Sequence, residues 1–224
     1  MKKLIELLDE PKIVGIVADP NQGKSNLIYA ILRDLYMEKN PFGLYTFGLR
    51  MNITGAIQIH SVRELSAISN SLVVLDEFFS LLDLENRKEH RNIESILRTM
   101  YHSNNIIILC GLPDNFRKFI AAKLNMVIFK QCSIPDFVNG SRVKSICLEY
   151  RQPAHPAQGD PMTDPYILKM NINKALVWNS NPPLTPDGKT GEAWTTVTVP
   201  FIQNCDTKAD LPPIFTLKGT SNAA

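Results

Sequence analysis

Short apolar runs alternate with longer, partly polar segments through the first two thirds of the chain. A short continuous apolar run is typical of a strand buried on both faces, and a longer segment with one apolar side is typical of a helix. This alternation predicts a mainly parallel sheet covered by helices on both faces, which is a three-layer α/β fold. The expected strands are 12–18, 44–50, 56–60, 72–75, 106–110 and 126–130, and the expected helices are 24–37, 61–69 with Ser61 as its cap, 88–103 and 113–124.

The pattern changes after Lys130. The runs 141–150 and 166–178 are predicted as further strands, and the segment that joins them carries four prolines. Ten of the fifteen prolines lie after Arg151. We therefore expect the last quarter of the chain to be extended and to wrap over the core or a neighbouring subunit, with residues 219–224 disordered.

The composition is ordinary for a globular protein. The 224 residues are 44% hydrophobic and 21% charged, which suffices for one sizeable core and an appendage. We place the core at 1–151 and a strand- and proline-rich C-terminal appendage at 152–224. No apolar stretch approaches the roughly 20 residues of a membrane span, and acidic residues near the start interrupt the apolar run that a signal peptide needs. A soluble intracellular protein is expected.

Charge is distributed unevenly, although the net charge is only +2. From Arg117 to Arg151, seven basic residues stand against two acidic ones, whereas residues 1–116 carry 12 basic and 14 acidic residues. A basic stretch of this kind fits a track for a nucleic acid. The alternative is an ordinary solvated face.

A phosphate-binding loop is predicted between the first strand and the first helix. The segment Ala18-Asp19-Pro20-Asn21-Gln22-Gly23-Lys24-Ser25 matches the pattern G-x-x-x-x-G-K-[ST], except that Ala18 replaces the first glycine. Backbone amides around Gly23 and the helix start then form a nest for phosphates. Lys24 reaches the β- and γ-phosphates, and the Ser25 hydroxyl binds magnesium. The expected ligands are ATP and Mg²⁺, and the expected nucleotide contacts are Asp19, Pro20, Asn21, Gln22, Gly23, Lys24, Ser25 and Asn26.

Two adjacent carboxylates, Asp76 and Glu77, close the apolar run 72–75. They then lie at the carboxyl edge of the sheet, where open α/β sheets bind their ligands. Successive strand residues point to opposite sides, so the two carboxylates need not share a role. We assign Asp76, with Ser25, to the magnesium shell and Glu77 to polarising the attacking water as general base.

The segment Ile96-Leu97-Arg98-Thr99-Met100-Tyr101-His102-Ser103-Asn104-Asn105-Ile106-Ile107-Ile108-Leu109-Cys110-Gly111 joins a helix with basic residues directly to a buried strand. This arrangement resembles the FtsK and HerA superfamily of DNA-pumping ATPases, and most of all the packaging ATPases of membrane-containing double-stranded DNA viruses. The resemblance continues into the helix that carries Arg117 and covers roughly residues 10–150. It implies a RecA/FtsK-like P-loop NTPase fold.

The resemblance also implies an assembly and a task. Family members form homo-oligomeric rings, here expected to be hexamers, that hydrolyse ATP at subunit interfaces and thread double-stranded DNA, in the viral case into an empty capsid. The expected location is the host cytoplasm or the virion vertex, and the expected docking partner is the capsid vertex or a membrane-associated viral protein. An arginine from the neighbouring subunit stabilises the transferring phosphate, with Arg98 as first candidate and Arg117 as second.

The same resemblance predicts a γ-phosphate sensor. In related ATPases the strand after the basic helix usually ends with a polar residue, often glutamine, but this chain has Cys110-Gly111. The resemblance therefore predicts that sensing passes to another polar group, such as Asn105 or Asn115.

For the DNA track, the sequence favours the segment 133–144, interpreted as a loop or hairpin whose turn is Asn139-Gly140. Arg142 and Lys144 follow that turn and are expected to contact DNA phosphates without regard to sequence.

Two other functions fit the sequence less fully. One is a P-loop kinase that acts on a small molecule, although Glu77 directly after Asp76 favours activation of water over transfer to an acceptor. The other is a viral assembly or scaffold protein that binds a nucleotide without turning it over. Substitution of Glu77 separates a motor from a scaffold, because only the motor needs the general base.

Overall fold

The computed structural model describes residues 6, 8, 10–39, 43–49, 51–53, 55–82, 86–151, 167–182, 192–199 and 215–217. The predictions for the proline-rich segment 152–165 and for the end of the chain, 219–224, lie outside these residues.

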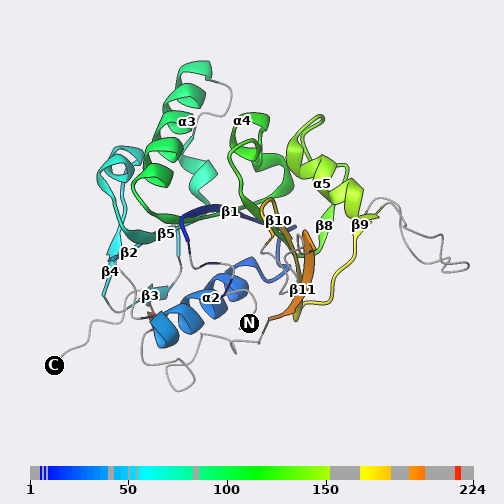
Figure 1. Ribbon diagram of the computed structural model, residues 1–224, viewed down its shortest axis with the longest axis horizontal. Helices are drawn as coiled ribbons and strands as arrows, with labels where there is room; N and C mark the ends of the chain where they lie inside the picture. The colour runs from blue at the N-terminus through cyan, green and yellow to red at the C-terminus, as the bar shows by residue number, and fades with distance from the viewer. Residues whose placement is uncertain are drawn as a thin grey trace, which may run out of the picture.

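An eight-stranded sheet forms the centre of the fold, in the order β11-β10-β7-β1-β6-β5-β2-β4 (Figure 1). The strands from β7 to β4 run parallel, while β10 pairs antiparallel with β7 and β11 pairs antiparallel with β10. This confirms the mainly parallel sheet that the sequence predicts. The strands are β1 (Lys12–Val17), β2 (Gly43–Phe47), β4 (Ala56–Gln58), β5 (Ser71–Asp76), β6 (Ile106–Gly111), β7 (Met126–Phe129), β10 (Lys174–Asn179) and β11 (Trp194–Thr198).

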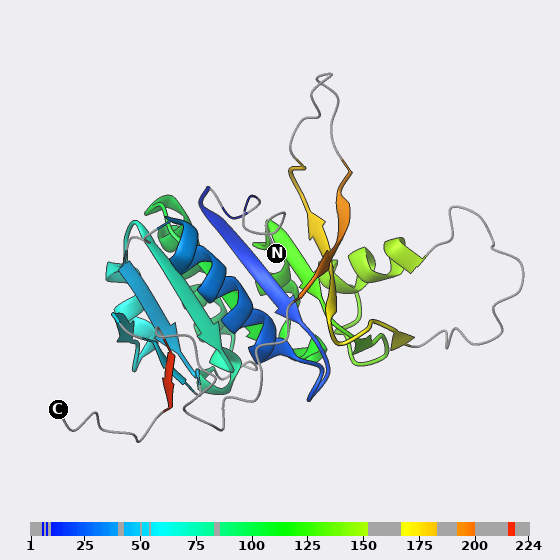
Figure 2. The same ribbon diagram turned by 90° about the horizontal axis from the view of Figure 1, so that it is seen from below.

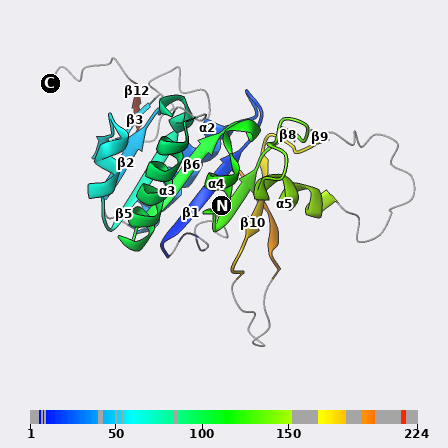
Figure 3. The same cartoon turned by 90° about the horizontal axis from the view of Figure 1, so that it is seen from above.

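Helices cover both faces of this sheet, which confirms the three-layer α/β fold. The helix α2 (Lys24–Lys39) lies on one face (Figure 2). The other face carries α3 (Arg87–His102), α4 (Lys118–Ala121) and α5 (Arg142–Arg151) (Figure 3). Within the described ranges, none of the helices is long and apolar enough to cross a bilayer.

Short elements complete the fold. Two small antiparallel pairs join β3 (Met51–Ile53) with β12 (Phe215–Leu217) and β8 (Cys132–Ser133) with β9 (Ile167–Leu168). Three short 3₁₀ helices connect larger elements: η1 (Val62–Ala67), η2 (Phe78–Leu81) and η3 (Pro113–Asn115).

Two apolar layers hold the sheet between its helices. Successive strand residues point to opposite faces, so Val14 of β1 packs in the layer beneath α2, while Ile13 packs in the layer beneath α3. Leu27 of α2 belongs to the first layer, and Leu97 of α3 to the second. Because β1 and β6 are buried on both faces, their nearly continuous apolar runs are the strongest strand signals in the sequence.

The prediction of a strand at 141–150 is wrong, because this segment forms the helix α5. Its buried side chains are Val143, Ile146 and Cys147, a spacing of three and four residues that fits one side of a helix. Ser141 stands at the helix start, where its Oγ accepts from the Lys144 amide at 3.2 Å. The serine cap and this spacing are the signals that the β-branched residues obscure.

Two predicted helices are also shorter than expected. The segment 61–69 forms only the 3₁₀ helix η1, and Ser61 does not cap it, since its Oγ donates to the Glu64 carboxylate at 2.9 Å. The segment 113–124 divides into η3 and the single turn of α4.

Candidate functional site

The predicted phosphate loop connects β1, near the middle of the sheet, to α2. Asn21 and Gly23 both have positive φ angles, of 60° and 80°. The Leu27 amide donates to the Gly23 carbonyl at 3.0 Å, so the helix begins directly after the loop. Its first turn contains no acidic residue. The amides and the dipole of this helix start are therefore oriented to receive an anion.

Lys24 lies across the loop. Its Nζ donates to the carbonyl oxygens of Ala18 at 3.0 Å and Asp19 at 2.9 Å. Asp19 in turn accepts from the Ser133 amide at 3.0 Å, which fastens the loop to β8. The ammonium group is thereby held against the start of the loop, and Lys24 also lines the cavity in front of it.

The structure brings Ser25 and Asp76 together, although they are 51 residues apart. The Ser25 hydroxyl donates to Asp76 Oδ2 at 3.4 Å. Among the described residues, no group of three or more histidine, cysteine, aspartate or glutamate side chains is placed to hold a metal ion. A hydroxyl and a carboxylate beside a phosphate loop can hold Mg²⁺ when phosphate oxygens complete its ligands, so the donor set fits this ion.

Burial raises the pKa of Asp76, and the neighbouring charge of Glu77 adds to the effect. A hydrogen bond from the Cys110 thiol, the charge of Lys24 and the Ser25 hydroxyl oppose it. The side chain of Asp76 is therefore a desolvated carboxylate that gains from a nearby cation.

Glu77 stands at the end of β5 in the left-handed region, with φ 54° and ψ 19°. This conformation is uncommon for a residue other than glycine and carries a strain that often marks a functional site. Gly48 follows β2, the strand that pairs with β5, and has a φ of 75°. A Cβ at Gly48 would lie 1.9 Å from the Asp76 carbonyl oxygen. The backbone around Asp76 and Glu77 is thus fixed by close packing against a residue that must be glycine.

A cavity of about 630 Å³ lies in front of these groups. Its size is within the range of small-molecule sites. A second, smaller cavity of about 300 Å³ contains none of the predicted nucleotide contacts. The residues that line the larger cavity are Pro20, Asn21, Gly23, Lys24, Ser25, Asn26, Asp76, Glu77, Phe79, Gly111, Leu112 and Asn115.

The two predicted sensor candidates lie in different surroundings. Asn105 is fully buried and structural: its Oδ1 accepts from the Ser71 amide, and its Nδ2 donates to the carbonyls of Ile68 and Met100. Asn115, in contrast, lines the cavity. Of the two, only Asn115 is placed to meet a nucleotide.

Sequence reasoning missed Lys130, which lies behind the phosphate loop. Its Nζ donates to the carbonyls of Ile172 and Lys174, the latter at 2.7 Å. Burial lowers the pKa of Lys130 to about 8. These hydrogen bonds tie Ile172 and the start of β10 to the end of β7, and only the presence of a lysine at the end of an apolar strand signals them in the sequence.

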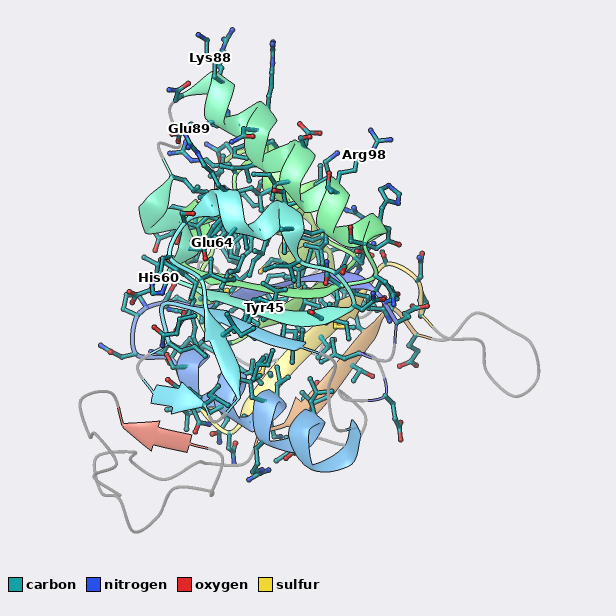
Figure 4. All side chains as sticks on the ribbon, turned by 90° about the vertical axis from the view of Figure 1, so that its left-hand side faces the viewer. Tyr45, His60, Glu64, Lys88, Glu89 and Arg98 are labelled. Atoms are coloured by element: carbon teal, nitrogen blue, oxygen red, sulfur yellow. The ribbon has the colours of Figure 1, made fainter. Side chains whose placement is uncertain are left out.

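Two arginines, Arg98 and Arg117, are the predicted candidates for a side chain that acts at the site of a neighbouring subunit. Arg98 is exposed and extends from α3 away from the sheet (Figure 4). Arg117 is half-buried at the start of α4. Neither arginine lines the cavity of its own chain.

The prediction of a loop or hairpin at 133–144 is confirmed only as a loop: residues 134–141 form a loop that turns at Asn139-Gly140, but Arg142 and Lys144 lie in the first turn of α5, so the segment is not a hairpin. The Arg142 guanidinium lies 5.0 Å from the centre of the Trp178 ring, and Lys144 Nζ donates to Asn139 Oδ1 at 2.7 Å. The turn at 139–140 leads into a helix instead of a second strand.

Solved structures of low sequence identity share this fold. The genome packaging NTPase B204 from Sulfolobus turreted icosahedral virus 2, in complex with sulfate, has a TM-score of 0.55 at 11% identity, covering 76% of this chain and 92% of that chain. Its complex with ATPγS gives 0.53 at 10% identity, covering 76% and 92%. No protein-family profile and no curated protein matches the sequence. The chain thus has the fold of an FtsK-type P-loop NTPase, and the predicted resemblance is confirmed at the level of the fold.

Proposed function

We propose that this protein is an ATPase whose site lies between the phosphate loop and the carboxylates of β5. The observation that carries the proposal is the contact between Ser25 and Asp76 at the cavity that Lys24 and Glu77 also line. These are the groups needed to bind a nucleoside triphosphate and its metal and to activate a water.

Each side chain has a distinct task. The loop amides and Lys24 bind the phosphates, and Ser25 with Asp76 holds the metal ion. Bound Mg²⁺ neutralises charge on the β- and γ-phosphates. Glu77 lies at the exposed side of the cavity, where it accepts a proton from a water directed at the terminal phosphate. The unusual backbone of Glu77 sets the direction of this carboxylate.

We further propose that hydrolysis drives double-stranded DNA through a homo-oligomeric ring, as a hexamer, during packaging of a viral genome. The fold likeness to a genome packaging NTPase supports this proposal. In the ring, Arg98 or Arg117 completes the site of the neighbouring subunit, and Arg142 with Lys144 contacts DNA phosphates. The ring acts in the host cytoplasm or at the virion vertex, docked to the capsid vertex or to a membrane-associated viral protein.

Steady-state hydrolysis of ATP, with and without linear double-stranded DNA, tests this function for the native chain and for Lys24→Ala. Turnover that rises with DNA and is lost in Lys24→Ala supports the translocase. Hydrolysis that is indifferent to DNA favours a small-molecule kinase or another P-loop enzyme. Nucleotide binding with no hydrolysis at any concentration favours a scaffold and overturns the proposal.

A further inference from the structure

Lys130, which follows β7, is a buried lysine beside the phosphate loop. Only 1% of its surface is exposed. Its Nζ donates to the carbonyls of Ile172 and Lys174. In the part of the chain that the structure describes, no ion pair involves Lys130. Within this part, two neutral carbonyl groups therefore surround its positive charge, and no carboxylate balances it.

This unbalanced charge makes burial of Lys130 unfavourable. An ammonium group loses its hydration when it is buried, and carbonyl oxygens replace only part of it. Burial lowers the pKa of Lys130 to about 8, and no neighbouring carboxylate opposes this effect. An anion that binds close to Lys130 would therefore stabilise the charged form of the side chain.

The side chain of Lys130 lies directly behind Gly23 of the phosphate loop. A Cβ placed on Gly23 would lie 3.6 Å from Lys130 Cε and 3.9 Å from the Ile172 carbonyl oxygen. Because this carbonyl accepts from Lys130 Nζ, the ammonium group is close to the Gly23 backbone. Gly23 also lines the cavity. The backbone of the loop thus stands between the buried cation and the cavity that is proposed to hold the nucleotide.

Main-chain hydrogen bonds fix the loop to the segment that carries Lys130. The Lys130 amide donates to the Val17 carbonyl at 2.9 Å, and the Asp19 amide donates to the Gln131 carbonyl at 3.0 Å. These bonds hold the start of the loop on both sides of Ala18. The position of the ammonium group relative to the loop is therefore set by the backbone of the sheet.

The other ionisable side chains near Lys130 come from the elements packed around it. The loop contributes Asp19 and Lys24, whose side chains are bonded to main-chain groups. From β8 comes Cys132, whose pKa is raised by a hydrogen bond to a neighbouring thiol and by burial. Lys174 of β10 is exposed and reaches Lys130 through its carbonyl. All of these remain when Lys130 alone is replaced, so such a variant isolates its charge.

We propose that the Lys130 ammonium group is a second cation of the phosphate site, which attracts the nucleotide phosphates from behind the loop at Gly23. This inference rests on the proposed nucleotide site and deepens it. Lys24 attracts the phosphates from the cavity side, whereas Lys130 acts through the loop without touching them. A bound phosphate supplies the negative charge that the surroundings of Lys130 lack.

The proposal makes nucleotide affinity depend on pH. A phosphate anion favours the charged form of Lys130, so its pKa is higher in the complex than the value of about 8 in the nucleotide-free protein. The contribution of Lys130 to affinity is complete below a pH of about 8, and it is lost as the pH rises through the higher pKa of the complex.

Binding of ADP to the full chain at pH 7 and at pH 9 tests the proposal with Lys130→Met, which keeps a long side chain but removes the charge. Omission of Mg²⁺ leaves the metal out of the comparison. At pH 7 the variant should bind ADP about tenfold more weakly than the native protein. At pH 9 the difference should be less than about threefold, because the native Lys130 has then lost most of its charge.

The matched control is Lys123→Met, the same change at a lysine that pairs with Glu94 at 2.7 Å. It should bind ADP like the native protein at both pH values. A second measurement needs no variant: calorimetry of ADP binding at pH 8.5, in two buffers of different ionisation enthalpy, should show uptake of about half a proton. This uptake decides the matter if Lys130→Met does not fold.

Equal losses of affinity at pH 7 and pH 9 in Lys130→Met would show a purely structural role and overturn the proposal. Unchanged affinity at pH 7, or no proton uptake by the native protein, would overturn it as well. A native protein that binds ADP with the expected pH dependence but does not hydrolyse ATP contradicts the proposed ATPase and still supports the role of Lys130. A native protein that binds no nucleotide overturns both.

Discussion

The Ser25 hydroxyl and the Asp76 carboxylate meet at 3.4 Å across the space between the phosphate loop and β5. This distance is long for a hydrogen bond between two oxygens, so the interaction is weak, and the carboxylate retains lone pairs for a cation. The Ser25 hydroxyl and the Asp76 carboxylate, from distant parts of the chain, thus face the same place in the cavity.

Substitution Ser25→Ala is expected to weaken the magnesium-dependent part of nucleotide binding. Removal of one oxygen from the ion's surroundings should raise the Mg²⁺ concentration for half-maximal ATPγS binding by about tenfold or more. Binding without magnesium should be nearly unchanged. Titration of Mg²⁺ at fixed nucleotide measures this, with Ser66→Ala on exposed η1 as control. Equal magnesium dependence in native protein and Ser25→Ala would refute the assignment.

Substitution Asp76→Asn is expected to stabilise the nucleotide-free protein while removing its response to magnesium. Burial raises the pKa of Asp76 above its ordinary value of 3.8, so the folded state binds more protons than the unfolded state just above that pH. The free energy of unfolding of the native protein therefore falls as the pH rises from 3.8 through the raised pKa, because the folded protein must then hold a buried charge. The free energy of unfolding of Asp76→Asn should exceed that of the native protein at pH 7, and the difference should shrink as the pH falls towards 3.8. Urea unfolding at several pH values measures it, and a variant less stable than native at pH 7 would contradict it.

Substitution Gly48→Ala is expected to destabilise the fold strongly. The new Cβ would lie 1.9 Å from the Asp76 carbonyl oxygen, and the φ of 75° is unfavourable for alanine. We expect a loss of about 3 kcal/mol or more. Gly140→Ala separates the two causes, because Gly140 has a similar φ of 69° but faces only the flexible end of Lys118. Gly140→Ala should lower the free energy of unfolding by about 1 kcal/mol, which is the cost of the unfavourable φ alone. Comparable losses in the two variants would show that contact with Asp76 does not constrain the site.

Mixed rings test whether Arg98 acts on the neighbouring subunit. Arg98→Ala and Glu77→Gln chains should each be inactive alone, because each ring lacks one group at every interface. In a mixture, some interfaces combine an intact Glu77 with an intact Arg98, so part of the hydrolysis should return, with a maximum near equal proportions. ATP hydrolysis across mixing ratios measures this. Arg117→Ala in place of Arg98→Ala tests the second candidate, and no recovery in either mixture would exclude a trans role for both.

How far the sequence predicts this molecule depends on how local each feature is. The phosphate loop and the carboxylates of β5 are contiguous motifs, so their position at one sheet edge follows from the alternation of elements. The sequence predicts a strand where α5 forms because Val143 and Ile146 favour strands locally, while packing against the core favours a helix. The contacts of Cys110 with Asp76 and of Lys130 with the carbonyl of Lys174 join distant segments, and no local pattern reveals them.

The most direct test of the account is a comparison of ATP binding and ATP hydrolysis in Glu77→Gln. The amide retains the size of the side chain but cannot accept a proton from water. We expect nucleotide affinity within about threefold of native, because the loop, Lys24, Ser25 and Asp76 are untouched, and a fall in kcat of at least about 100-fold. Binding and turnover measured on the same preparations decide the matter. Hydrolysis at the native rate in Glu77→Gln would contradict the assigned mechanism.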